Sequence, residues 1–223
     1  MKNNLTEKDI ENLNKWAEKY DIEELKIKDK EKIFNLEELH ITSHNLTELP
    51  KEIGILTNLK ILDIFNNLKE LPKEIFNLIN LEELDITNHN LTELPKEIGN
   101  LINLEELYIC NVNLIELPKE IGNLTNLKRL NIRTNNFTKL PKEIGNLINL
   151  EKLYIDCNNL EISPDGIEKL INLEKLYIEI NIEINIDINI INKDFNFKSL
   201  PIKEIGKLNN LKDLSIRIRK WEK

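Results

Sequence analysis

Residues 81–103 read LEELDITNHNLTELPKEIGNLIN, and the next 23 residues, 104–126, read LEELYICNVNLIELPKEIGNLTN. The same letters recur at a fixed period of 23 residues. A unit of this length is one supersecondary turn that cannot bury its apolar face alone, so neighbouring units must stack. The two copies therefore predict a solenoid in which each unit contacts only its neighbours.

Seven copies of this unit can be aligned along the chain. They begin at Leu36, Leu59, Leu81, Leu104, Leu127, Leu150 and Leu173. The second copy is one residue short, and the last runs to 38 residues. Strand-like fragments at residues 22–27 and from residue 211 onward flank the array, so we expect about nine strands.

Each class of position within a copy predicts a local role. Apolar residues recur at positions 1, 4, 6, 11, 14, 18 and 21, which in the third copy are Leu81, Leu84, Ile86, Leu91, Leu94, Ile98 and Leu101. Positions 4 and 6 alternate with polar residues, as in a strand with one buried face. Six of the seven prolines stand nine residues before the next copy, and Pro201 stands ten before it; at this place they favour the first residue of a helical turn. Glycine four residues later is expected to supply backbone freedom, and the asparagine that ends each copy is expected to bond turn backbone.

The pattern L-x-x-L-x-I-x-x-N-x-L-x-x-L-P-K-E-I-G-N-L-x-N resembles the leucine-rich repeat family, in its 23-residue class, over residues 22–219. The resemblance implies an α/β repeat fold: a right-handed solenoid with a concave parallel β-sheet and short helical or 3-10 turns on its convex side. It also implies a protein-binding scaffold.

The sequence departs from the family pattern at some positions. The asparagine at position 9 is kept only in some copies, as Asn67, Asn135, Asn158 and Asn181, and is replaced by His44, His89 and Val112 in others. We expect the asparagines one residue later to share its backbone-bonding role, namely Asn45, Asn90, Asn113, Asn136 and Asn159. Ser163 replaces the leucine of position 14, so its layer should pack less well unless Ile162 shifts inward.

Residues 1–223 are expected to form a single domain with two unlike ends. Residues 1–35 should supply an N-terminal helix and a capping strand, with Thr6 and Asp9 as a capping box ahead of a helix over residues 7–19. Repeats fill residues 36–210, with an insertion at about 181–195, and a C-terminal strand covers residues 211–223. Isoleucine alternates with polar residues from residue 178 to residue 190, which predicts last strands that extend beyond the regular sheet.

Composition narrows the class of protein. The formal net charge of −8 argues against nucleic acid and against an anionic membrane surface as partners. The first 13 residues are polar and charged, unlike a signal peptide, and no apolar run reaches the ~18 residues of a membrane span. Cys110 and Cys157 lie two repeats apart, too far for a disulfide, which favours a reducing cytoplasmic setting. Secretion without a cleaved signal peptide stays open as an alternative.

No motif for catalysis is present in the sequence. It has no phosphate loop, G-x-S-x-G, H-E-x-x-H or C-x-x-C. His44 and His89 stand two layers apart, and His40 and His44 lie in one strand and the turn after it, whereas a zinc site needs three or four converging ligands. Glu183, Asn185 and Asp187 could be interpreted as a calcium face, but oxygens two apart on a flat strand do not converge. We therefore predict that the protein is not an enzyme and has no cofactor and no metal.

Variation between copies concentrates at positions 3, 5 and 7, which should point out of the concave sheet. The first copies place acidic residues there, and the later ones place tyrosine, arginine and lysine. Tyrosine and arginine are enriched at binding hot spots, although stacking between layers would explain the tyrosines equally well. The predicted partner-binding residues are Asp63, Phe65, Asp85, Tyr108, Arg129, Arg133, Lys152, Tyr154, Lys175 and Tyr177.

The sequence favours a non-enzymatic scaffold that binds a protein partner through its concave sheet face. The alternative is a structural protein that self-associates through its exposed C-terminal strand or insertion, because the alternating isoleucine segment would present a strand edge. We expect a monomer without nucleic-acid or membrane contacts, and a homodimer through the C-terminal edge is the alternative state.

Overall fold

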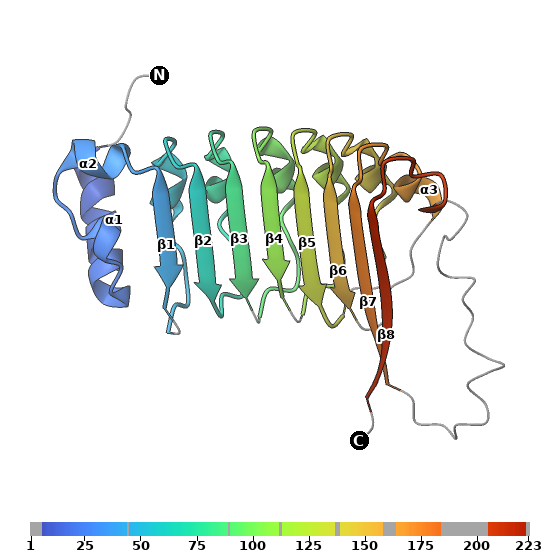
Figure 1. Ribbon diagram of the computed structural model, residues 1–223. Coiled ribbons are helices and arrows are strands. Elements are labelled where there is room, and N and C mark those ends of the chain that lie inside the picture. The colour runs from blue at the N-terminus through green and yellow to red at the C-terminus, as the bar shows by residue number, and fades with distance from the viewer. Residues whose placement is uncertain are drawn as a thin grey trace.

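A computed structural model describes residues 6–43, 45–88, 90–111, 113–136, 139–157, 164–183 and 205–221. Its centre is one parallel sheet of eight strands that lie side by side in chain order (Figure 1). The strands are β1 (Glu38–Thr42), β2 (Ile61–Asn66), β3 (Glu83–Asn88), β4 (Glu106–Cys110), β5 (Arg129–Thr134), β6 (Lys152–Cys157), β7 (Lys175–Glu183) and β8 (Asp213–Trp221). Equivalent positions of successive copies are register partners, as the period predicts.

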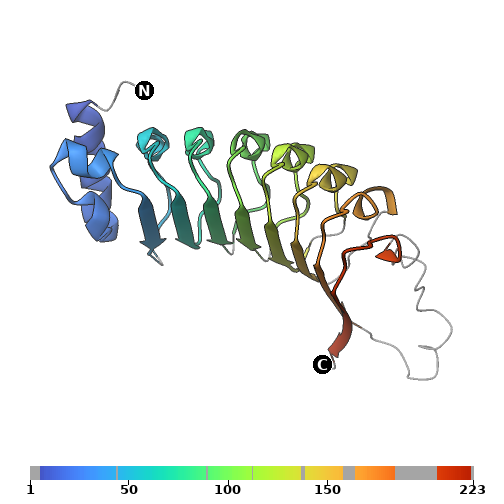
Figure 2. The ribbon, with the colours of Figure 1, turned by 45° about the horizontal axis from the view of Figure 1, so that its top comes forward.

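The chain passes from one strand to the next through a short turn. These turns lie on the side of the solenoid opposite the sheet (Figure 2). Most are 3-10 turns: η2 (Lys51–Ile55), η3 (Lys73–Asn77), η4 (Lys96–Asn100), η5 (Lys119–Asn123) and η6 (Lys142–Asn146). The sixth copy has a short α-helix instead, α3 (Pro164–Ile167). The result is the expected right-handed solenoid, with the sheet on one side and the turns on the other.

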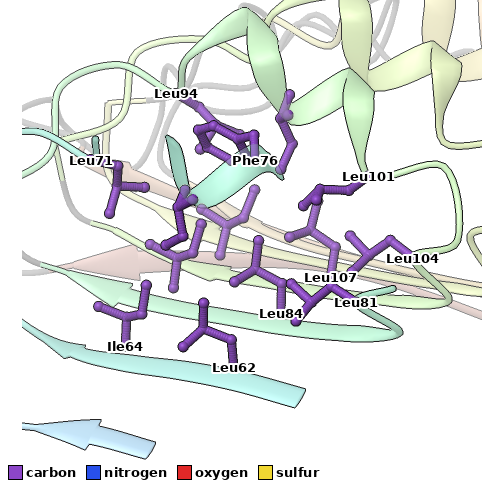
Figure 3. Packing of buried hydrophobic residues seen from close by; sticks show 14 of the residues in the cluster. Leu62, Ile64, Leu71, Phe76, Leu81, Leu84, Leu94, Leu101, Leu104 and Leu107 are labelled. Atoms are coloured by element: carbon purple, nitrogen blue, oxygen red, sulfur yellow. The ribbon is translucent and has the colours of Figure 1, made fainter. Parts of the chain in front are cut away.

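The core lies between the sheet and the turns as ladders of leucine and isoleucine (Figure 3). On the strands every second residue points inward, and Leu84 and Leu107 have no exposed surface. Phe76 replaces the usual glycine in η3 and is also fully buried. The apolar positions assigned from the sequence are therefore the core positions.

Proline and glycine stand at the expected places in the turns, but their roles differ from those expected from the sequence. Each proline before a 3-10 turn is the N-cap rather than the first helical residue, and its carbonyl accepts the first hydrogen bond, as in Ile121 N–H to Pro118 at 3.0 Å. No glycine in the described part has a positive φ. A Cβ at Gly122 would lie 2.6 Å from the Glu143 carbonyl oxygen of the next turn. Glycine is thus needed for close approach of neighbouring turns, not for backbone freedom.

The asparagine that ends each copy forms the expected ladder. Its side-chain amide donates to a backbone carbonyl one layer back, at 2.7–3.0 Å, for Asn58, Asn80, Asn103, Asn126, Asn149, Asn172 and Asn210. Asn126, for example, donates to Ile102 at 2.9 Å. These bonds tie each turn to its predecessor and satisfy carbonyls that the strands leave unpaired.

In the layers of β2, β4 and β5 the inward polar side chain at the strand end stands at position 8, as Asn66, Asn111 and Thr134, not at position 9 as the family pattern suggested. Asn111 is fully buried and donates to the Leu91 carbonyl at 2.6 Å, and Thr134 donates to Leu114 at 3.0 Å. Asn67 and Asn135, at position 9, are exposed. The remaining position-9 residues named above, His44, His89, Val112 and Asn158, lie outside the described residues or, for Asn181, have a side chain that is not described.

One helix closes the N-terminal end. Helix α1 (Glu7–Tyr20) begins with the predicted Thr6–Asp9 capping box. Trp16 packs against the first layer and donates its indole N–H to the Glu48 carbonyl at 2.9 Å. Residues 22–27 do not form the expected ninth strand: they hold the 3-10 turn η1 (Glu23–Leu25), which is followed by α2 (Lys30–Phe34). Ile22 and Leu25 are buried against the cap, so their apolar spacing reflects packing without sheet pairing.

The last two strands are longer than the others, as the alternating isoleucines predicted. Both β7 and β8 contain 9 residues, and they pair along their whole length from Lys175 with Asp213 to Glu183 with Trp221. Predictions for the rest of the insertion, including Asn185 and Asp187, and for Ser163 fall outside the described residues.

Candidate functional site

Positions 3, 5 and 7 form three rows across the outer face of the sheet. The central row runs His40, Asp63, Asp85, Tyr108, Asn131, Tyr154, Tyr177 and Ser215. On its two sides run Glu38, Ile61, Glu83, Glu106, Arg129, Lys152, Lys175 and Asp213, and Thr42, Phe65, Thr87, Cys110, Arg133, Asp156, Glu179 and Arg217. All ten predicted site residues therefore lie on one face of the sheet.

The acidic half covers β1 to β4. Asp63 and Asp85 are register partners, and so are Glu83 and Glu106. Partial burial and the neighbouring acidic groups raise the pKa of both Glu83 and Asp85 above the usual carboxyl range. Like charges on neighbouring strands destabilise a sheet, so this half carries a local energetic cost that an approaching cation would relieve.

Two polar partners partly offset that cost. The His40 imidazole lies 2.6 Å from an Asp63 carboxylate oxygen, joining Nδ1 and Oδ2. The Thr87 hydroxyl donates to Asp85 at 3.0 Å. Phe65 of β2 lies in the same half, with 38% of its surface exposed. The acidic half thus combines two partnered carboxylates with one exposed ring.

A three-residue cluster joins the two halves at β4 and β5. Arg129 donates to a Glu106 carboxylate oxygen at 2.9 Å and to the Tyr108 hydroxyl at 2.7 Å, and the Tyr108 hydroxyl donates to Glu106. Hydrogen bonding to Tyr108 raises the pKa of Arg129, and burial raises the pKa of Tyr108. Arg129 Nε is buried without a hydrogen-bond partner among the described residues. The cluster holds Tyr108 in a fixed position at the centre of the face.

The aromatic and basic half covers β5 to β8. The rings of Tyr154 and Tyr177 lie 6.2 Å apart between centroids at an interplanar angle of 36°. The guanidinium carbon of Arg217 lies 5.7 Å from the Tyr177 centroid, within the range of a cation–π contact. Arg133 forms an ion pair with Asp156 at 3.2 Å. Lys152 and Lys175 are register partners at the edge of this half and give it its positive charge.

Three contributors to this face were missing from the predicted site residues. Glu179 is only 5% exposed and accepts the hydroxyl hydrogen of Tyr177, so it orients that ring. Arg217 covers the other side of the same ring, and Glu106 holds Tyr108. Their repeat positions could have identified them, because all three stand at position 3 or 7, in the rows that the register defines. Cys110 lies half-buried between the halves, and burial raises the pKa of its thiol.

A second concave feature follows the edge where the strands begin. Two grooves that share Glu105 and Asn126 run along it, lined by the ladder asparagines and by the charged residues of position 2. Three lysines among them pair with a glutamate of the preceding layer: Lys60 with Glu37 at 2.7 Å, Lys128 with Glu105 at 2.6 Å and Lys212 with Glu174 at 2.6 Å. The grooves repeat the same chemistry in each layer, so they follow from the ladder and give no convergent site.

The described residues show neither a metal site nor a membrane span. Within them, no group of three or more His, Cys, Asp or Glu side chains is placed to hold a metal ion. No helix in the same part of the chain is long and apolar enough to cross a membrane. The two cysteines are free thiols on β4 and β6.

Stacked parallel strands, opposite turns and an asparagine ladder define a solenoid repeat protein with a charge-segregated sheet face. The sequence matches the family described as leucine-rich repeat region over residues 12–114 and again over residues 107–223. The chain belongs to the leucine-rich repeat family. No curated protein matches the sequence.

Several solved structures share this fold. A leucine-rich repeat protein of Leptospira interrogans is 33% identical with a TM-score of 0.65, over 86% of this chain and 46% of that one. Internalin C2 of Listeria monocytogenes is 18% identical with a TM-score of 0.62, over 95% of this chain and 85% of that one. The ectodomain of the Arabidopsis thaliana receptor kinase GASSHO1/SCHENGEN3 is 23% identical with a TM-score of 0.52, over 82% and 24%. The chain thus spans about half the length of the Leptospira protein it resembles.

Proposed function

We propose that the protein is a non-enzymatic interaction scaffold that binds a protein partner across the outer sheet face between Asp63 and Tyr177. The observation that carries the proposal is the separation of charge along that face. The rows on β1 to β4 hold five carboxylates and no lysine or arginine, whereas those on β5 to β7 hold two arginines and two lysines against the two carboxylates of Asp156 and Glu179. The opposite face repeats Lys-Glu-Ile with little change. Residue types vary where a partner would touch and stay constant elsewhere.

The same arrangement specifies the chemistry of the partner. Its surface should be basic opposite Asp63, Glu83 and Asp85, and acidic opposite Lys152 and Lys175. Such complementarity steers encounter and fixes orientation. Tyr154 and Tyr177 supply the anchor, because a pair of held rings provides contact area at low entropic cost. Eight strands spaced ~4.8 Å apart span about 34 Å, enough for a standard interface of about 800 Å² per partner.

The family supports this type of function without naming the partner. The GASSHO1/SCHENGEN3 ectodomain was solved in complex with CASPARIAN STRIP INTEGRITY FACTOR 2, so a related fold binds another molecule. The proposal includes no cofactor and no catalytic step. Free thiols at Cys110 and Cys157 support a reducing compartment, which is why the cytoplasm remains the proposed location.

A comparison of two triple variants tests the binding face. Tyr108, Arg133 and Tyr154 are replaced by alanine in one, and the exposed Lys96, Lys119 and Lys142 of the turn face in the other. We expect proteins captured by the wild type from native lysate to be retained by the turn-face variant. The sheet-face variant should capture at least about tenfold less of these proteins, which corresponds to the loss of roughly one hot spot. Equal capture by the two variants would remove the sheet face as the binding site, provided that circular dichroism confirms both folds.

A further inference from the structure

The two ends of the solenoid differ in how well the core is covered. At the N-terminal end Leu13 and Ala17 of α1 are fully buried against the first layer. At the other end Leu214 of β8 is 49% exposed, whereas the equivalent leucines of the seven preceding strands are at most 1% exposed. Ile216 and Leu211 are also only partly buried. The row of inward leucines is therefore buried on β1 to β7 and half-exposed to solvent on β8.

Strand β8 is the edge of the sheet that the described residues form. It is the last strand of the sheet and pairs only with β7 among the described strands. The Asp213 N–H donates to the Glu174 carbonyl at 3.0 Å, toward β7. Backbone groups of successive residues in a strand alternate in direction, so those of Leu214 and Ile216 point away from β7. An unpaired edge of this kind is a template for another strand.

We propose that the occupant of this edge is a second copy of the chain, paired antiparallel through β8 about a two-fold axis at Ser215. A two-fold contact uses the same patch on both copies, and two edge strands related in this way run antiparallel. Leu214 then lies opposite the partner's Ile216, and Asp213 lies opposite the partner's Arg217. Each of these pairs occurs twice.

Backbone geometry and charge select this register together. Leu214 and the partner's Ile216 have outward backbone groups and can exchange two hydrogen bonds. Asp213 and the partner's Arg217 then form a non-hydrogen-bonded pair, where facing side chains come closest. An axis at Arg217 would put two arginines opposite each other, and an axis at Asp213 would do the same with two aspartates. Of these three axes, the one at Ser215 joins opposite charges and covers Leu214 with an apolar residue.

This contact goes beyond the proposed function and is independent of it. The dimer axis lies at β8, next to the strands β2 to β7 that carry the proposed binding face, so each copy keeps its outer sheet face open. Arg217, which covers the Tyr177 ring, belongs to both contacts. The dimer would join two such faces side by side and make the assembly bivalent toward repeated partners. The edge is short, so we expect a dissociation constant in the roughly micromolar range, below the stability of an obligate dimer.

Charge reversal on one residue at a time tests the register. Asp213→Lys places a lysine opposite the partner's Arg217, and Arg217→Glu places a glutamate opposite the partner's Asp213. Each variant alone therefore turns two attractive pairs into two repulsive ones and should raise the dissociation constant in sedimentation analysis by roughly tenfold or more. A mixture of the two variants restores opposite charge at both pairs and should form a heterodimer with near wild-type affinity. Local damage to the fold cannot produce that recovery.

Cross-linking provides a second measurement. Ser215→Cys, with Cys110→Ser to remove the half-buried thiol, should form a disulfide-linked dimer, because facing non-hydrogen-bonded residues have Cα atoms about 4.5 Å apart. Lys212→Cys in the same background is the control, since this exposed position would lie about 20 Å from its copy. A wild type that stays monomeric up to about 1 mM would overturn the proposal. So would mixed variants that fail to associate, or equal cross-linking at residues 212 and 215.

Discussion

At the scale of single residues, small polar side chains buried behind the strands hold the layers in register. Asn111 is fully enclosed, donates to the Leu91 carbonyl and accepts from the Asn113 backbone at 2.9 Å. Thr134 occupies the equivalent position one layer on and donates to Leu114. Removing the donor from a buried carbonyl costs more than an ordinary hydrogen bond contributes. These positions should therefore tolerate exchange among small donors but not their removal.

Asn111→Ala tests this directly. We expect it to lower the free energy of unfolding by about 2–4 kcal/mol, because it removes the buried hydrogen bond to the Leu91 carbonyl and opens a small cavity. Asn111→Thr, which copies the next layer, should cost clearly less. Asn135→Ala, an exposed asparagine, should stay within about 0.5 kcal/mol of the wild type. Urea unfolding measures all three, and an equal cost for Asn111→Ala and Asn135→Ala would contradict the assigned role.

The raised pKa of Asp85 on the sheet face leads to a prediction about how stability depends on pH. Burial and the Asp63 charge raise the pKa of Asp85, so the folded state holds that proton more tightly than the unfolded state does. The contribution of this group to stability is then fully present below the ordinary Asp pKa of about 3.9 and is lost as pH rises through the raised value.

Asp85→Asn keeps an acceptor for Thr87 and removes the charge. It should raise the melting temperature at pH 7, and the gain should shrink toward zero as pH falls below about 4. Glu116→Gln, at an exposed position, is the control and should leave melting unchanged at both pH values. A lower melting temperature for Asp85→Asn at pH 7 would show that the carboxylate is not strained.

At the scale of elements, the spacing of the turns is set by backbone contact. A Cβ at Gly122 would stand 2.6 Å from the Glu143 carbonyl oxygen and 2.9 Å from the Glu143 Cβ, both in the next turn. Backbone cannot rotate aside as a long side chain can, so neighbouring turns must move apart to admit a methyl group. Gly206 stands at the same repeat position in the last turn and is exposed.

Gly122→Ala should therefore be costly although alanine favours helical turns. We expect a loss of about 1–3 kcal/mol in the free energy of unfolding, the usual cost of overpacking. Gly206→Ala should be neutral or slightly stabilising, because no further turn of the described chain packs against it. Thermal melting of the two variants separates the explanations: if backbone freedom were the reason for glycine, both would lose stability alike.

The elements also show how much the sequence could predict. The strands, the turns, the asparagine ladder and the α1 capping box follow from the period, because equivalent letters must line up when identical units stack. The segment at residues 22–27 shares the apolar spacing of a strand, but α1 covers it and it turns instead. The inward side chain at position 8 was missed because the family pattern stresses position 9. Contact between Tyr177, Glu179 and Arg217 depends on side-chain geometry that no period specifies.

At the scale of the whole molecule, the fold is a regular support on which only the exposed rows differ between layers. The acidic half ends at Glu106 and the basic half begins at Arg129, and these two side chains pair where the halves meet. One end of the support is closed by α1, and the other exposes β8. Partner binding across the face and self-pairing at the edge share Arg217 but otherwise use different residues, so changes at Tyr154 or at Asp213 separate them.

The central claim is that equivalent positions lie in straight rows, and a distance between spin labels at Glu38 and Lys175 tests it most directly. These exposed positions belong to one row, on β1 and β7, and six strand spacings of ~4.8 Å separate them by about 29 Å. With Cys110→Ser and Cys157 left in the core, pulsed electron resonance should give one distance near that value, and labels at Glu38 and Lys152 should give one about 5 Å shorter. A broad distribution, or equal distances for the two pairs, would contradict the stacked register and the binding face built on it.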